Sequence, residues 1–82
     1  MNARQFETLR DLEFATDNLG KYGIQYARPL DVGGSNGSHH GATLRWLADH
    51  GYAERKTYRA WARNVHKYRI TELGRKYIAD RS

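Results

Sequence analysis

The chain has 82 residues, no cysteine and a formal net charge of +5. A chain of this length folds as one domain, residues 1–82, around one small core, and the lack of cysteine excludes disulfides and thiolate metal sites. No stretch approaches the roughly 18 apolar residues of a membrane span, and the charged start does not fit a signal peptide. We therefore expect a cytoplasmic protein with acidic partners, nucleic acid first.

The first third of the chain predicts one long helix and a short turn. Apolar residues recur at helical spacing over residues 4–19, with Asn2 as a good N-cap and Gly20 as a usual residue just past a helix end. Residues 24–27 predict a short strand or an extended connector. Proline is well tolerated in a first helical turn, so residues 29–32 are expected to form one such turn.

The segment 33–38 has the strongest turn composition of the chain, and the pattern predicts a second full helix over residues 39–50. Ser38 is a good N-cap for this helix, and Gly51 is a good residue to end it. At about 100° per residue, the side of this helix that we expect to face the core consists of Leu44, Leu47 and Ala48.

The last third predicts two strands and a helix. The strands cover residues 52–58 and 65–70 and are joined by a polar loop over residues 59–64. One side of the second strand is more apolar because it carries His66, Tyr68 and Ile70. Thr71 caps the final helix, whose apolar side consists of Leu73, Tyr77 and Ile78. The expected fold class is α+β, with three to four helices and a two-stranded β-hairpin.

The strongest functional signal is a run of positive charge in the expected hairpin. Between residues 55 and 71 there are six basic residues and no acidic one, so the rest of the chain sums to about −1 (+5 minus +6). The basic residues are Arg55, Lys56, Arg59, Arg63, Lys67 and Arg69. Charge concentrated in this way, interleaved with aromatic residues, is typical of a surface that faces a polyanion.

The aromatic residues of this region allow two interpretations. Tyr58 and Trp61 can pack on sugars, stack on bases or fill a groove. The alternative is a solvated hairpin whose aromatic side chains only cover the core, and we favour that interpretation for Tyr52, Tyr68 and Tyr77.

The outward side of the helix over residues 39–50 is the second candidate surface. If this helix enters a major groove, its first residues reach base edges, and the candidates for contact are Ser38, His39, Thr43, Arg45 and Trp46. The turn before it leaves free backbone N–H groups for a phosphate, to which Ser35 and Asn36 add side-chain hydrogen bonds. The plainer alternatives are that Trp46 packs against the hairpin or the first helix, and that the turn only lets two helices cross.

Other chemistries are not indicated. No lysine follows Gly37 as a nucleotide-binding loop requires. The neighbouring His39 and His40 point about 100° apart on a helix and do not chelate one metal ion. No nucleophile, base and orienting acid come together in the pattern. We expect no enzyme activity, catalytic residue, metal or cofactor.

Two segments resemble the winged helix-turn-helix DNA-binding proteins, and most closely small bacterial or phage members with wings like those of MarR and PadR proteins. Residues 42–55, ATLRWLADHGYAER, follow the family pattern LxxLxxxGxVxR, with Ala53 at the place of the valine; this pattern leads from the recognition helix into the wing. Residues 68–75, YRITELGR, follow YxLTxxGR, with Ile70 at the place of the leucine; this pattern leads from the wing into the final helix.

The resemblance implies sequence-directed binding of double-stranded DNA, usually in transcriptional control, in a bacterial cell or a phage-infected host. The recognition helix is then 39–50, in the major groove, and the basic wing is 55–69, on the backbone or in the minor groove. Within this wing, the DNA contacts that we expect from its charge and aromatic residues are Arg55, Lys56, Tyr58, Arg59, Arg63 and Lys67.

The partners other than duplex DNA stay open at this point. A homodimer is one, and Phe14 is then the expected exposed apolar contact. A protein-interaction module on the same fold, which binds and modulates an acidic partner protein, is the main alternative function. RNA binding is a third.

Overall fold

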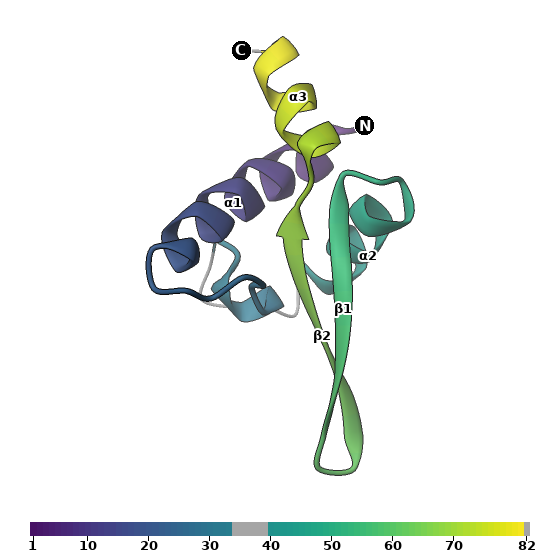
Figure 1. Ribbon diagram of the computed structural model, residues 1–82. Helices are drawn as coiled ribbons and strands as arrows, with labels where there is room; N and C mark the ends of the chain where they lie inside the picture. The colour runs from purple at the N-terminus through teal and green to yellow at the C-terminus, as the bar shows by residue number, and fades with distance from the viewer. Residues whose placement is uncertain (34–39, 82) are drawn as a thin grey trace.

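The computed structural model describes residues 1–33 and 40–81. The elements of this described part are three α-helices, one short 3-10 helix and two strands, in the order α1 (Ala3–Gly20), η1 (Pro29–Asp31), α2 (Gly41–Asp49), β1 (Ala53–Ala60), β2 (Arg63–Ile70) and α3 (Glu72–Arg81). Figure 1 shows the helices gathered around one end of the β1–β2 hairpin, whose other end projects away from them. The predicted α+β class is confirmed.

The first helix begins as predicted and ends later. Asn2 Oδ1 accepts a hydrogen bond from the Gln5 N–H at 2.8 Å, and Gln5 Oε1 accepts one from the Asn2 N–H at 2.9 Å, which confirms the N-cap. The prediction that Gly20 ends the helix is wrong, because α1 includes that residue. The chain turns at Gly23 instead, where a φ of +78° is a conformation that favours glycine.

The connector after α1 returns to the hairpin. The expected strand over residues 24–27 reduces to one bridge, in which Ala27 and Tyr68 exchange two backbone hydrogen bonds of 2.7 Å. The predicted turn at residues 29–32 is confirmed as η1, and the Asp31 carboxylate accepts a hydrogen bond from the Arg28 N–H at its start. This connector therefore packs a third stretch of chain beside β2.

The second full helix is shorter than predicted. Because α2 begins at Gly41, the N-cap position belongs to His40, and the prediction of Ser38 as N-cap is wrong. The end of the helix agrees with the prediction. Gly51 has a φ of +84°, and the next N–H, of Tyr52, donates to the Leu47 carbonyl at 2.9 Å.

The core lies where α1, α2 and the base of the hairpin meet. Leu44 and Leu47 are fully buried as expected, while Ala48 lies half-buried at the margin. The other buried hydrophobic residues are Leu9, Leu12, Ala15, Ala27, Val32, Ala53, Tyr68, Ile70 and Ile78. Tyr68 is the largest fully buried side chain, so the hairpin contributes the centre of the core rather than its edge.

The hairpin is longer and tighter than predicted. The strand register runs from Ala53 opposite Ile70 to Ala60 opposite Arg63, so the predicted loop over residues 59–64 is wrong. Only two residues, 61 and 62, form the turn. The buried residues of the hairpin all lie at the end near the helices, and the other end projects into solvent (Figure 1).

The final helix is tied to the end of α2. Thr71 Oγ1 accepts a hydrogen bond from the Gly74 N–H at 3.1 Å, as expected of a cap, and donates one to the Gly51 carbonyl at 2.7 Å. Gly74 is buried with no room for a side chain, since a Cβ there would collide with the Tyr52 carbonyl. Because Gly74 faces inward, Leu73 is turned outward and is 50% exposed, so its predicted place on the apolar side is wrong.

Replacing Thr71 by alanine is expected to lower the free energy of unfolding by about 1–2 kcal/mol, because it removes the cap and the bond to Gly51 together. Urea denaturation followed by circular dichroism measures this. Thr71→Ser is the matched control and should keep most of the stability, since it keeps the hydroxyl. Equal midpoints for Thr71→Ala and the unchanged protein would contradict the role of this side chain.

Candidate nucleic-acid interface

The basic residues of the hairpin lie on both of its faces. Alternate pairs of the strand register point to opposite sides of a two-stranded sheet. One face carries Lys56, Arg63, Lys67 and Arg69, and the other carries Arg55 and Arg59. The predicted hairpin residues are thus brought together in space, but they surround the hairpin rather than forming one flat patch.

The first face is organised by two tyrosine rings. The Arg69 guanidinium lies 4.9 Å from the centre of the Tyr26 ring, and the Lys56 ammonium lies 5.5 Å from the same ring. Lys56 and Lys67 then approach the Tyr58 ring at 5.4 Å and 4.9 Å. We call this set, Arg69, Tyr26, Lys56, Tyr58 and Lys67, the cation–ring row. Aromatic faces orient cations without cancelling their charge, so the two lysines are held in place and still charged.

One end of the cation–ring row is neutralised. Glu54 accepts a hydrogen bond from the Tyr26 hydroxyl at 2.6 Å and forms an ion pair with Arg69 at 2.9 Å. These contacts, the tyrosine first, hold the pKa of the Glu54 carboxyl below its usual range, and the same hydrogen bond raises the pKa of Tyr26. Within the described part of the chain, Arg69 is the only one of the six hairpin cations with an ion pair.

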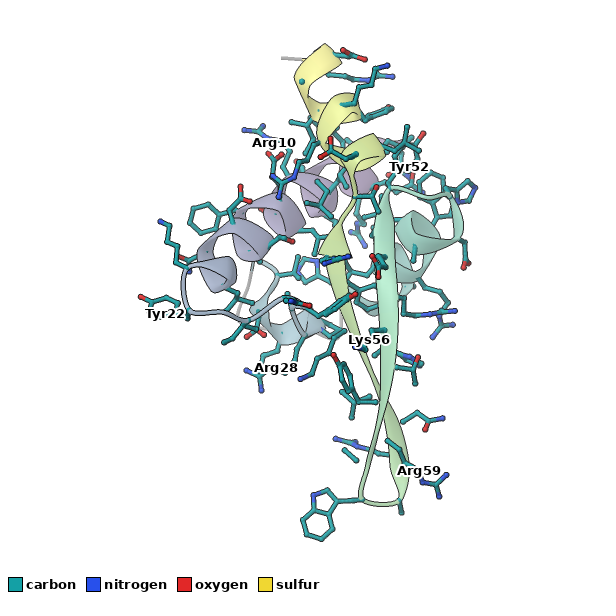
Figure 2. The ribbon with its side chains drawn as sticks, in the orientation of Figure 1. Arg10, Tyr22, Arg28, Tyr52, Lys56 and Arg59 are labelled. Carbon is teal, nitrogen blue, oxygen red and sulfur yellow. The ribbon has the colours of Figure 1, made fainter. Side chains whose placement is uncertain are left out.

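The opposite face extends the positive charge to the free end. Arg55 and Arg59 are exposed, and between them Thr57 Oγ1 and His66 Nδ1 are hydrogen-bonded at 2.9 Å. Figure 2 shows Arg59 near the free end of the hairpin and Lys56 nearer the helices. Five cations that have no ion pair among the described residues are therefore spread along the hairpin.

Fewer of the described side chains on the outward side of α2 are fully exposed than the sequence suggested. Arg45 is exposed and Thr43 is half-buried. Trp46 is half-buried as well, because its indole stacks on the His50 ring at 3.9 Å and lies 6.2 Å from the Tyr52 ring. Trp46 thus packs on the residue that caps α2 and on the residue just before β1. Arg45 is the one basic side chain in the described part of this helix that is exposed.

The same stack continues into the body of the protein. The Tyr77 ring meets Tyr52 edge-on at 5.3 Å and lies 6.0 Å from Phe6. With Tyr68 buried and the other two partly buried against the core, the interpretation of Tyr52, Tyr68 and Tyr77 as core-covering residues is confirmed. These three tyrosines are therefore not part of the candidate interface.

Four predicted contacts lie outside the described residues: Ser35, Asn36, Ser38 and His39. Conversely, Tyr26 belongs to the cation–ring row but was not predicted from the sequence. The only signal for it was the expected strand at residues 24–27, which did not indicate where on the hairpin its side chain would lie. Glu54 was also missed, although its pairing with Arg69 follows directly from the strand register.

The charge on α1 is opposite in sign to that on the hairpin. This helix carries four acidic residues, Glu7, Asp11, Glu13 and Asp17, against the two basic residues Arg4 and Arg10. Arg75 of α3 pairs with two of them, at 3.4 Å to Glu13 and 2.8 Å to Asp17, and lowers the pKa of Asp17. The positive charge is therefore concentrated on the hairpin, and the acidic residues of α1 lie apart from it.

Over residues 1–33 and 40–81, no group of three or more histidine or acidic side chains is arranged to hold a metal ion. None of the helices described there is long and apolar enough to cross a membrane. Comparison with protein-family models, curated proteins and solved structures finds no match for this chain. The hairpin and α2 are therefore the parts of the molecule from which a function can be inferred.

Proposed function

We propose that this protein binds double-stranded DNA as a small winged-helix protein, with the β1–β2 hairpin as the wing and α2 as the recognition helix, and that it acts in transcriptional control. The observation that carries the proposal is the projecting hairpin with five cations that have no ion pair within the described residues. Such cations are available to neutralise phosphates, and each phosphate contact adds about 0.9 to the slope of log affinity against log salt.

The arrangement of these cations on two faces favours a groove as the docking surface. A groove of duplex DNA is bordered by the phosphates of both strands, so a hairpin lying in or along it meets negative charge on either side. Arg55 and Arg59 face one border, and Lys56, Lys67 and Arg63 face the other. An acidic protein surface would contact only one face of the hairpin and leave the other in solvent.

The role of α2 as reader of sequence rests on Arg45, which is exposed on its outward side. Arginine commonly reads guanine through a bidentate contact in the major groove. Arg45→Ala is therefore expected to relax the preference at one base pair, at a cost of about 1–3 kcal/mol on the preferred site. Anisotropy titrations on the preferred duplex, obtained by selection from random sequence, and on a random duplex measure the two affinities.

If Arg45→Ala loses the same affinity for the preferred duplex as for the random one, Arg45 contacts a phosphate and does not read a base. Lys76→Ala is the matched control, because it removes one positive charge from α3 at the other end of the molecule from the hairpin tip (Figure 1). We expect this variant to keep both the affinity and the preference.

The experiment that tests the proposed function is the fluorescence anisotropy of a labelled random 30-base-pair duplex titrated with the protein at several salt concentrations. We expect micromolar binding that weakens steeply as salt rises. The alternative function, binding to an acidic partner protein, is separated from this one by competition. If random DNA fails to bind at low salt, the hairpin serves a protein partner and the proposal is wrong.

A further inference from the structure

The tip of the hairpin carries the most exposed side chain of the large hydrophobic residues that the structure describes. Trp61 is the first of the two turn residues, and its side chain is 99% exposed. A tryptophan has more apolar surface to bury than almost any other residue. In this position its indole contributes nothing to the core, which lies at the other end of the hairpin (Figure 1).

Trp61 also has an unfavourable backbone conformation. Its φ is +58°, which makes it the only non-glycine residue of the described chain in the left-handed region. Two-residue hairpin turns place glycine or asparagine at such positions, because a bulky side chain is disfavoured there. A glycine would form this turn more easily, so the tryptophan costs stability in the backbone, and its exposed ring recovers none of it by burial. Residues that are costly in this way cluster at functional sites.

The neighbours of Trp61 give the tip a particular shape. Ala60 and Ala62 flank it in the chain, so the only large side chain of the turn is the indole. Arg63 stands opposite Ala60, and Arg59 belongs to the next pair of the register, so positive charge begins immediately behind the narrow tip. A narrow hairpin turn with one apolar side chain at its tip and cations behind it fits a narrow groove bordered by two rows of phosphates.

We propose that Trp61 is a wedge that enters the minor groove and inserts its indole between two neighbouring base pairs, which bends the duplex. This inference rests on the proposed function. The minor groove is about 6 Å wide, which admits a turn whose flanking residues are alanines. Apolar side chains inserted in this way partly unstack one base step and kink the duplex toward the major groove. The arginines behind the tip then reach the phosphates on both borders.

A membrane surface would be the other apolar environment for an exposed indole, but the hairpin does not suit it. Anchoring at a bilayer needs a broad apolar face, such as that of an amphipathic helix. Here one ring projects beyond two alanines, and the next side chains along both strands are polar or charged. Vesicles are therefore a control of the test below.

The test compares three variants by duplex affinity and by the distance between dyes at the two ends of a 30-base-pair duplex. Trp61→Gly removes the ring and suits the positive φ, so its urea midpoint should equal or exceed that of the unchanged protein, which shows that it folds. Trp61→Phe keeps a flat ring and should keep part of the bend. Phe14→Ala is the matched control, because Phe14 is an exposed aromatic residue on α1, 75% exposed and away from the hairpin.

We expect the unchanged protein to shorten the distance between the duplex ends. Trp61→Gly should bind about tenfold more weakly, with an unchanged salt slope and no bend, because no charge is lost. Phe14→Ala should match the unchanged protein in all three readings. A Trp61→Gly variant that binds and bends DNA as the unchanged protein does would overturn the wedge while leaving the proposed function standing.

Two further results would also overturn the wedge. The first is that the unchanged protein binds the duplex without bending it, which shows that no wedge is inserted. An unchanged protein that does not bind the duplex at all removes the proposed function and the wedge together. In that case, binding to vesicles of anionic lipid that is lost in Trp61→Gly would assign the indole to a membrane surface.

Discussion

Replacing Arg59 and Arg63 together by alanine is expected to weaken binding to every duplex, specific or random, by about 60-fold at a salt concentration of about 0.1 M. Each phosphate contact adds about 0.9 to the salt slope, which corresponds to about eightfold in affinity at this concentration relative to 1 M. Both residues are exposed near the free end of the hairpin, on opposite faces, and neither has an ion pair within the described chain. The salt slope should fall by about 1.8 at the same time.

The matched control for this double variant is Lys21→Ala with Lys76→Ala. It changes the net charge by the same amount, but the two lysines follow α1 and belong to α3, outside the hairpin. Anisotropy titrations at four salt concentrations give both slopes. If the control pair lowers the affinity as much as the hairpin pair does, the protein binds DNA through its net charge and the assignment to the hairpin is wrong.

Replacing Tyr68 by alanine is expected to lower the free energy of unfolding by about 3–5 kcal/mol, the range for truncating a large aromatic core residue. Tyr68 is 2% exposed, and its backbone pairs with both Ala27 and β1. A domain of this size has a total stability of about 4–12 kcal/mol. Tyr68→Ala should therefore lose a large share of its stability, with a much lower urea midpoint, and any loss of duplex binding should follow the fraction that is unfolded.

Tyr68→Phe separates the ring from the hydroxyl in this experiment. The ring fills the core, whereas none of the hydrogen bonds found in the described chain involves the hydroxyl, so this variant should stay within about 0.5 kcal/mol of the unchanged protein. Urea denaturation measures all three proteins. A cooperative transition for Tyr68→Ala at the midpoint of the unchanged protein would contradict the view that the hairpin forms the centre of the core.

The helices were predictable because their apolar residues recur at a regular spacing. Leu9, Leu12, Leu44 and Leu47 stand at helical intervals and are all buried. Helix ends were harder to place, since Gly20 and Gly23 are both plausible past the end of α1, and only the positive φ of Gly23 decides between them. Leu73 has an apolar side chain but is displaced from the core by the inward-facing Gly74.

The projecting half of the hairpin and its contact with the connector were the parts that the sequence did not reveal. A strand is easiest to predict where one of its faces is buried. No residue from Arg59 to Asn64 is buried, and the stretch has no alternation of apolar and polar residues, so it resembled a loop. Tyr26 meets the hairpin through tertiary packing, and no local pattern links it with Lys56, thirty positions further along the chain. The positive charge itself was visible from the sequence, but its division between two faces required the strand register.

Whether the hairpin and α2 bind duplex DNA can be measured residue by residue, from the backbone amide chemical shifts of the ¹⁵N-labelled protein titrated with a 30-base-pair duplex at low salt. We expect the largest shifts in residues 55–67 of the hairpin, with further shifts in α2 around Arg45 and small ones along α1. We also expect these shift changes to become smaller at all affected residues as the salt concentration is raised. Unchanged spectra, or shifts confined to α1 and α3, would contradict the account.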